Sequence, residues 1–537
     1  MTLSRPGRPA VTSETPEARA AGGRGAGLSR EVLVLASVVV LGTIMTVLDL
    51  TIVNVAVPTI GSRLHASIPA IQWVLTGYML AFATVIPVTG WAAERFGAKR
   101  LWLTALGLFL VGSVLAGAAW SVGSLVAFRV VQGLGAGMIL PVGQSILAQA
   151  AGPARMGRVM SVIGVPMLLA PVFGPVIGGA IIGAASWRWI FLINLPIGAA
   201  ALIATWRLFP DAEPQHGERL DLRGLMLLCP GIGVFLYGMS QAGNRGGFSN
   251  AAVIAALAGL TLIALFFWHA TGRGSTALID VSLLRRRGFG SAAALNFLLI
   301  IGLFGSLILI PLYYQLVRHD GPLQIGLLLG PQGLGAAMAL PLAGWLTDRF
   351  GARTVSSVGV VIAAIGTLGY TQIEARTSDL YLAGMLLVIG AGIGATITPS
   401  MAAAFKALSH AETPRASSAL NAIQRIAGAI GTASFAIILQ HAINARLPGR
   451  GDTAIGVLAR HSPAHTAQAL AGAFGTTFWV AAALIALALL PALFLPSSGR
   501  LDHAGPADAS EGQAGVGQAG VGQAGVEGNA GQATTAA

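Results

Sequence analysis

The stretch GWAAERFGAKR, from Gly90 to Arg100, returns later in the chain as GWLTDRFGAR, from Gly344 to Arg353. Glycine, tryptophan, an acid, arginine, phenylalanine, glycine, alanine and a final base occupy matching places in both copies. Each copy joins two long apolar runs, and eight such runs separate the copies. Because an even number of membrane crossings returns the chain to the same side, the repeat predicts two parallel halves, a plan found in many transporters.

The apolar runs themselves predict a membrane protein. The chain is 55% hydrophobic and 10% charged, which excludes an ordinary soluble domain. Fourteen runs are long enough to cross the ~30 Å hydrocarbon core as helices. They lie at about 33–58, 70–92, 101–121, 123–148, 158–184, 187–208, 223–241, 251–270, 290–316, 323–347, 354–373, 379–401, 417–442 and 471–496.

These spans divide most simply into two six-helix halves, at 32–210 and 273–496, around a linker and two-helix insert at 211–272. GLGA at Gly133 and GIGA at Gly392 are a second echo of the repeat. Residues 1–31 and the GQAGV-repeating segment 497–537 cannot bury a core, so both tails are expected to be disordered.

The distribution of basic residues predicts the orientation. With a cytoplasmic N-terminus, 22 of the 32 lysines and arginines fall on cytoplasmic segments, 8 on outer segments and 2 within spans. The positive-inside rule therefore places both termini in the cytoplasm. The arginines are scattered between apolar runs, so we expect no nucleic-acid partner. With one cysteine, no visible metal site and no phosphate-binding loop, we expect neither a metal, nor ATP-driven pumping, nor an enzyme.

Asp49 is the only carboxylate in the middle of a predicted span, within LDLTIVNVAVP from Leu48 to Pro58. Ionisable residues at that depth are costly and usually mark an ion or substrate path. Arg129, in LVAFRVVQGLGAG, is predicted at a depth where it can meet Asp49. Burial favours the neutral carboxyl and a nearby arginine favours the ionised one, a competition that proton exchange needs. A static pair that only holds helices together is the alternative.

Three motifs together carry a family resemblance that covers roughly residues 33–496. GWAAERFGAKR resembles the signature of the major facilitator superfamily, and LDLTIVNVAVP with WRWIFLINLPIG, from Trp187 to Gly198, resembles its fourteen-span drug:proton antiporter branch. The resemblance implies the major-facilitator-type fold, drug or antibiotic efflux, and a role in proton coupling for the arginine at position 129. The chain departs from the signature at Glu94, where aspartate is usual, and at Ala98.

In the resembling family, such basic–acidic segments form salt bridges that hold one access state and break in the other. Orientation by positive charge alone is the alternative. The residues expected to act in gating are Gly90, Glu94, Arg95, Gly97, Lys99 and Arg100 in the first copy, and Gly344, Asp348, Arg349, Gly351 and Arg353 in the second.

The fifth span contains GVPMLLAPVFGPVIGG, which resembles the motif that marks exporters within the superfamily. Its prolines remove backbone donors and its small residues allow close helix approach. We expect this span to rock against a neighbour in the other half. The residues concerned are Gly164, Pro171, Gly174, Pro175, Gly178 and Gly179.

Three further polar residues are weaker candidates for the cavity or its network. Gln132 lies one turn from Arg129, and either extends the polar network or only packs. Asn54 follows Asp49 by five residues, which is not the spacing of a shared helix face. Arg425, about eight residues inside the span at 417–442, either reaches back to the interface or lines the cavity.

Together these features predict an exporter of amphipathic drugs or antibiotics in a bacterial cytoplasmic membrane, driven by a proton gradient and needing no cofactor. Its expected partners are membrane lipid, protons and a small substrate; we expect a monomer, and an adaptor with an outer-membrane duct remains open. With one membrane carboxylate, exchange of few protons for a monovalent cation is the simplest case. An uptake symporter and a passive channel are the alternatives.

Overall fold

The computed structural model describes residues 29–66, 68–151, 159, 162, 164, 173–174, 177–210, 220–244, 247, 249–406, 408–409, 412–447 and 466–496. This part of the chain contains helices and no strand. The two predicted tails lie almost wholly outside the described residues. The predicted division into halves and insert stays a prediction.

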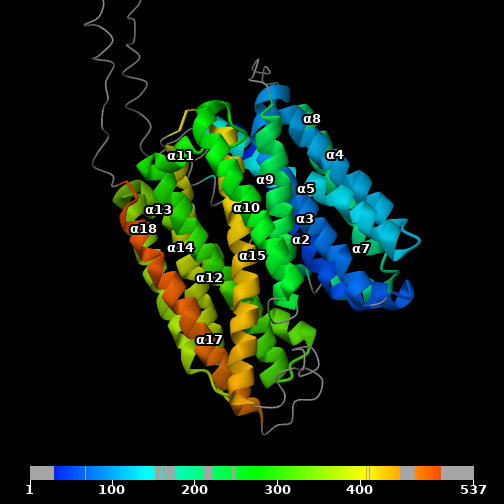
Figure 1. Ribbon diagram of the computed structural model, residues 1–537, viewed down its shortest axis with the longest axis vertical. Helices are drawn as coiled ribbons and strands as arrows, with labels where there is room; N and C mark the ends of the chain where they lie inside the picture. Colours follow the sequence, from blue (N-terminus) through cyan, green and yellow to red (C-terminus); the bar gives the residue numbers. More distant parts are fainter. Residues whose placement is uncertain are drawn as a thin grey trace, which may run out of the picture. The chain divides into compact units, whose positions relative to one another are not determined.

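The helices follow the apolar runs closely (Figure 1). They are α2 (Arg30–Arg63), α3 (Ile68–Phe96), α4 (Ala98–Gly117), α5 (Val122–Ala151), α7 (Trp189–Leu192), α8 (Asn194–Leu208), α9 (Leu222–Asn244), α10 (Asn250–Arg273), α11 (Ser282–Arg285), α12 (Arg287–Val317), α13 (Pro322–Gly369), α14 (Asp379–Lys406), α15 (Thr413–Arg446), α17 (Ala467–Leu487) and α18 (Leu489–Leu493). Short 3-10 turns follow α10 and α13, at Gly274–Thr276 and Tyr370–Gln372.

Thirteen stretches of the described residues are long and apolar enough to span a membrane, which confirms the all-α membrane fold. Each coincides with one of the predicted runs, and α13 supplies two of them, Gln324–Thr347 and Arg349–Gln372. The remaining predicted span, 158–184, lies largely outside the described residues.

The repeated motif is more helical than its sequence predicts. Helix α3 continues to Phe96 and α4 begins at Ala98, so the expected loop is reduced to Gly97 with φ 85°. The second copy bends the same way at Gly351, with φ 83°, inside the helical run α13. Only glycine adopts this backbone conformation without strain, which explains why each copy carries a glycine there.

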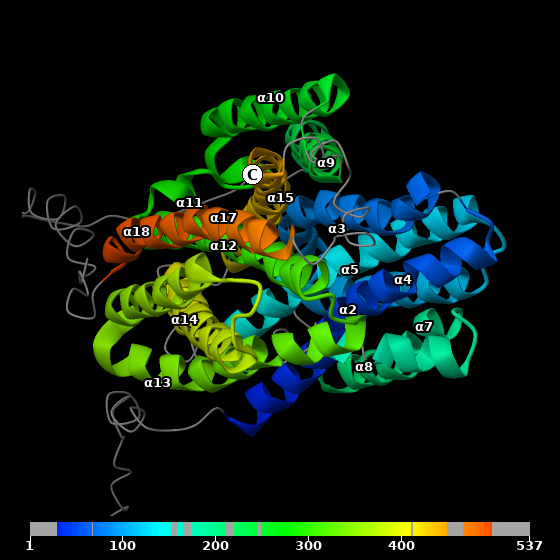
Figure 2. The same ribbon diagram turned by 90° about the horizontal axis from the view of Figure 1, so that it is seen from below.

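Helix α15 lies at the seam of the bundle. It contacts α12 on one side and both α3 and α5 on the other. Helices α9 and α10, the predicted insert, pack on each other, and α9 also contacts α3 and α15, as Figure 2 shows. The insert therefore covers one edge of the α3–α15 contact.

Candidate functional site

The centre of the site is a buried ion pair between Asp49 on α2 and Arg129 on α5. Arg129 Nη1 lies 2.5 Å from Asp49 Oδ2, and both side chains have 0% exposure. A charge-assisted hydrogen bond of this length is strong. The attraction between the two charges offsets the free energy that each side chain loses when it is removed from water. The structure thus brings together the two residues that the sequence singled out for proton coupling.

Two amides and a hydroxyl complete the network around the Asp49 carboxylate. Gln132 Nε2 and Asn194 Nδ2 donate to Asp49 Oδ1 over 2.9 and 3.0 Å. Arg129 Nη1 also donates to Gln132 Oε1 over 2.7 Å. Ser113 Oγ accepts from Gln132 and Asn194 over 3.2 and 3.0 Å. The carboxylate is therefore held by α5 and α8 directly and by α4 through Ser113.

Sequence reasoning missed Ser113 and Asn194. Asn194 stands in WRWIFLINLPIG, a motif used for its resemblance alone, and it is the first residue of α8. Ser113 donates to the carbonyl of Phe191 over 2.8 Å, which ties α4 to α7. The sequence offered one signal for these two residues: each is an isolated polar side chain inside an apolar run. Such a group needs a hydrogen-bond partner when it is buried.

Arginine 129 also lies on an aromatic surface. Its guanidinium carbon is 3.9 Å from the ring centroid of Tyr78 and 5.7 Å from that of Phe191. Its Nε donates weakly to the carbonyl of Val74 over 3.4 Å. Within the described residues, Arg129 Nη2 and the buried Tyr78 hydroxyl have no hydrogen-bond partner, so both are available to a rearranged network.

Small residues allow the helices that carry these side chains to approach closely. A Cβ at Gly112 of α4 would lie 2.6 Å from the Cα of Gln132, and one at Gly133 would lie 2.5 Å from the carbonyl oxygen of Tyr78. Such distances leave no space for a side chain. The glycines therefore fix the α4–α5 and α3–α5 spacings on which the network depends.

Two described glycines of the fifth-span motif pack against α2. A Cβ at Gly174 would collide with Thr51 on α2, and one at Gly178 would lie 3.3 Å from Ile52. Of the described glycines, Gly174 and Gly178 therefore do not face the other half, whereas Gly164 does, against Leu340 of α13. The expected rocking of this span stays a prediction. The Gly179 position has open space around it, and Pro171 and Pro175 lie outside the described residues.

Two weaker candidates lie apart from the network. Asn54 is exposed on α2, and no hydrogen bond joins it to a described residue. Arg425 lies on α15 with its guanidinium carbon 4.3 Å from the ring centroid of Phe82 on α3, so it faces the other half. The structure thus adds Gln132 to the pair and leaves Asn54 and Arg425 outside it.

A polar seam closes the bundle at one end, where the first copy of the repeat meets α15. Arg415 donates to Glu94 Oε2 from Nε and Nη2, over 3.0 and 2.8 Å. A Cβ at Gly90 would lie 2.9 Å from the Cα of Arg415. Glu94 therefore forms an ion pair across the seam, while its gating role stays a prediction.

Hydrogen bonds extend this seam one turn further along α15. Ser417 Oγ donates to the Pro141 carbonyl over 2.9 Å, and Ser418 Oγ donates to the Ile86 carbonyl over 2.6 Å. Asn421 Nδ2 donates to Gln144 Oε1 over 2.8 Å. Among the described residues, the hydrogen bonds that join α15 to α3 and α5 all lie near this end.

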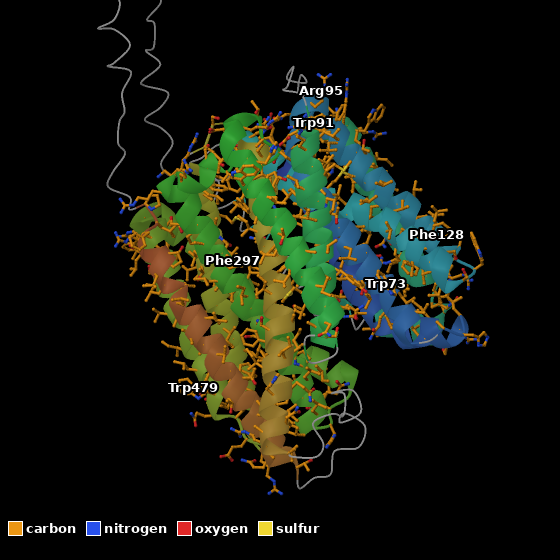
Figure 3. All side chains as sticks on the ribbon, viewed as in Figure 1. Trp73, Trp91, Arg95, Phe128, Phe297 and Trp479 are labelled. Carbon is orange, nitrogen blue, oxygen red and sulfur yellow. The ribbon has the colours of Figure 1, made fainter. Side chains whose placement is uncertain are left out.

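The other basic residues of the first copy are more peripheral. Arg95 and Arg100 are exposed, and Lys99 is half-buried. Figure 3 shows Arg95 beside Trp91 at the end of α3, with Trp73 towards the other end. These positions suit cytoplasmic charge anchors as well as gating.

The second copy lies within α13. Gly344 is buried and Arg353 is exposed, while Arg349 lies 5.9 Å from the Trp345 ring and 5.5 Å from the Phe350 ring of its own segment. The Asp348 side chain lies outside the described set. Among the side chains of the second copy that the structure describes, none forms an ion pair with the other half.

A second ion pair braces the start of α15. Arg286 donates to both carboxylate oxygens of Glu412 over 2.5 and 3.1 Å. This bond lowers the pKa of Glu412 below its ordinary value, and bonds from Ser409 act in the same direction. The Arg286–Glu412 pair therefore stabilises the folded protein fully above the pKa that Glu412 has in the unfolded chain. This contribution is lost as the pH falls through the lower pKa that Glu412 has in the folded protein.

Residues 39–432 match the family model of the Major Facilitator Superfamily. The chain belongs to this superfamily. A "Multidrug resistance protein B homolog" of Mycobacterium tuberculosis (H37Rv) is 40% identical over 482 residues, covering 86% of this chain and 89% of the relative. The "Multidrug export protein EmrB" of Haemophilus influenzae is 34% identical over 397 residues, covering 73% and 77%.

A solved structure agrees at the level of the fold. The proton:xylose symporter XylE superposes with a TM-score of 0.59, covering 88% of this chain and 97% of that one at 14% identity. The identity is too low to carry function across. The membership confirms a multi-pass membrane transporter, and places the Asp49 network and the Glu94–Arg415 seam in a transporter fold.

Proposed function

We propose that this superfamily member exports amphipathic drugs or antibiotics across a bacterial cytoplasmic membrane, driven by protons and without a cofactor. Relatives named for multidrug resistance and multidrug export support the transport class. The single observation that carries proton coupling is the buried Asp49–Arg129 pair. A titratable carboxylate at membrane depth, with an adjustable partner, is the usual component of a proton relay.

The geometry suggests how a proton would change the network. Protonation removes the charge that holds Arg129 and turns one carboxylate oxygen into a donor. At present Asp49 Oδ2 accepts from Arg129, and Oδ1 accepts from Gln132 and Asn194. A proton on either oxygen therefore forces one of its donors to turn away. Because these partners come from α5 and α8, the helices can shift relative to α2.

Alternating access then requires the seam at α15 to open. The Glu94–Arg415 pair and the hydrogen bonds around Asn421 hold this end closed, so the structure corresponds to a state closed on that side. With both termini cytoplasmic, as the arginine distribution favours, this is the cytoplasmic side. In this proposal a proton enters from outside, the side on which the substrate leaves.

Substrate would pass unmodified, so no enzymatic step is proposed. The protein would act in contact with lipid and as a monomer. An adaptor and outer-membrane duct are compatible with the exporter role. The uptake symporter and the channel are separated from the exporter by the direction of flux and its dependence on the gradient.

Purified full-length protein in liposomes tests the proposal directly. An imposed pH gradient should drive a fluorescent amphipathic compound against its concentration gradient, in the direction opposite to proton flow. Nigericin, which collapses the pH gradient, should stop this uphill movement. Movement in the same direction as the protons would instead show a symporter, and purely downhill flux that ignores the gradient would show a channel.

Breaking the seam should expose the closed end. We expect Glu94→Gln and Arg415→Gln each to reduce the free energy that favours the closed state by about 1 kcal/mol. The population of the open state should then rise roughly fivefold. The measure is the alkylation rate of Ala422→Cys, a buried site on α15, after replacing Cys229, the one native cysteine. The double variant should react no faster than either single variant, since the pair acts as a unit.

The chain supplies a matched control for this experiment. Arg318 and Asp379 form an ion pair of similar length, 2.5 Å, away from the Glu94–Arg415 pair, between the end of α12 and the start of α14. Asp379→Asn should leave the labelling of position 422 unchanged. Unchanged labelling in the Glu94 and Arg415 variants, or an equal rise in Asp379→Asn, would contradict a gating role for the seam.

A further inference from the structure

Arg425 is a membrane-embedded cation without an acidic partner. Within the part of the chain that the structure describes, no hydrogen bond or ion pair joins its guanidinium to an acceptor, and its close contact is the face of the Phe82 ring. Arg129, by contrast, is fully neutralised by Asp49. With Asp49 ionised, the three charged side chains, Asp49, Arg129 and Arg425, therefore sum to one positive charge.

Its depth shows that Arg425 does not reach back to the membrane surface. It lies twelve residues into α15, about 18 Å along the helix. Phe82, the ring it covers, lies fourteen residues before the end of α3 at the same side, about 21 Å. The side chain therefore points across the seam at mid-membrane depth, and the interfacial alternative left open by the sequence is wrong.

The guanidinium is positioned where the two halves separate. It is one helical turn beyond Asn421, whose bond to Gln144 is the last hydrogen bond of the closed seam among the described residues. Arg425 is half-buried, whereas Arg129 is completely enclosed. A guanidinium has five N–H donors, and leaving them without acceptors at this depth is costly, so an anion that reaches them is bound favourably.

The surroundings indicate what kind of anion fits. Phe82 and Tyr78 lie one turn apart on α3 with ring centroids 6.1 Å apart, and the Tyr78 ring lies under Arg129. An aromatic surface with one unpaired guanidinium suits a planar apolar body that carries a single acidic group. A monovalent cation, the simplest substrate expected from the sequence, would be repelled by the net positive charge.

We propose that Arg425 recognises the acidic group of the substrate, and that this transporter prefers amphipathic organic acids. The inference rests on the proposed export function and specifies its substrate class. It also predicts that one proton entering and one anion leaving move charge in the same sense. Transport of an acid would then respond to membrane potential as well as to the pH gradient.

One aromatic scaffold with three charges provides the test. Anthracene-9-carboxylate, 9-anthracenemethanol and 9-(aminomethyl)anthracene are titrated by fluorescence anisotropy into the full-length protein in nanodiscs of zwitterionic lipid, in gluconate buffer. The carboxylate should bind at least about tenfold more tightly than the alcohol, as expected for a charge-assisted hydrogen bond. The amine should bind more weakly than the alcohol.

Variants assign the preference to Arg425. Arg425→Gln should remove the advantage of the carboxylate while leaving alcohol binding unchanged, and Arg425→Lys should retain part of it. Arg376→Gln, at an exposed arginine after α13, controls for general loss of positive charge and should bind like the unmodified protein. Thermal unfolding confirms that each variant is folded. Because Arg425 has no acidic partner, its replacement by glutamine removes an uncompensated charge, and we expect no loss of stability.

The outcomes separate this inference from the export proposal. Three results would each overturn it. They are equal binding of the three compounds, a carboxylate preference that survives in Arg425→Gln, and an unfolding temperature that chloride raises although the carboxylate is not preferred. Gradient-driven flux of the alcohol by the unmodified protein reports on export independently. A carboxylate preference without any gradient-driven flux supports the Arg425 site and contradicts export; flux without the preference does the reverse.

Discussion

Asp49→Asn is expected to reduce gradient-driven transport to the level of protein-free liposomes. Asparagine keeps the size of the side chain but cannot exchange a proton at any physiological pH. Its amide nitrogen would also face the amide donors of Gln132 or Asn194, or the guanidinium of Arg129. Coupling is therefore lost even if the compound still binds, and substrate counterflow without a gradient should continue.

The unpaired Arg129 in this variant needs its own control. Removing one member of a buried pair costs about 3–5 kcal/mol, which lowers thermal stability. The double variant Asp49→Asn/Arg129→Gln removes the uncompensated charge, so its unfolding temperature should recover part of the loss while gradient-driven transport stays absent. Asn54→Ala, five residues away and exposed, should behave as the unmodified protein. Retained gradient-driven transport by Asp49→Asn would contradict the assignment of Asp49 as the proton carrier.

Gly112→Ala should destabilise the protein by about 1–3 kcal/mol, because the added methyl overpacks the α4–α5 contact. Its Cβ would lie 2.6 Å from the Cα, Cβ and backbone nitrogen of Gln132, none of which is the end of a flexible side chain. The two helices must separate, which moves Ser113 away from Gln132 and loosens the support of Asp49. We therefore expect transport to fall together with stability.

Helix α4 also contains the control for this substitution. A Cβ at Gly107 meets nothing within 4 Å, so Gly107→Ala makes the same chemical change without a clash. Alanine favours the helix over glycine by about 1 kcal/mol in water, so this variant should be neutral or slightly more stable. Thermal unfolding in detergent, followed by tryptophan fluorescence, compares the two. Equal unfolding temperatures would contradict this prediction and show that the α4–α5 spacing tolerates a side chain at position 112.

Much of the fold was predictable because the bilayer imposes a strong constraint on sequence. A spanning segment must satisfy its own backbone and face lipid, so it appears as a long apolar run. Thirteen of the predicted runs coincide with spanning stretches of the described residues for this reason. The bends at Gly97 and Gly351 were less visible, since the charged motif around them suggested loops rather than helix ends joined by one residue.

The site was predictable only in part. Asp49 and Arg129 stand out because a charge in an apolar run is rare, and their depths indicated that they could meet. Ser113 and Asn194 carry no such signal, since uncharged polar residues in helices commonly bond to their own backbone. Arg415 was equally hidden, because an arginine near a cytoplasmic helix end is explained by topology alone.

By itself, the sequence determined that this is a polytopic helical protein with a repeated charged motif and one ionisable pair within its apolar spans. Those properties depend on run length, charge count and periodicity, which are local. Only the tertiary structure decided which polar groups hold Asp49, that Gly174 and Gly178 pack on α2, and that Arg425 has Phe82 rather than an acid beside it. Such facts depend on the rotation of each helix about its axis, and neighbouring helices set that rotation by packing.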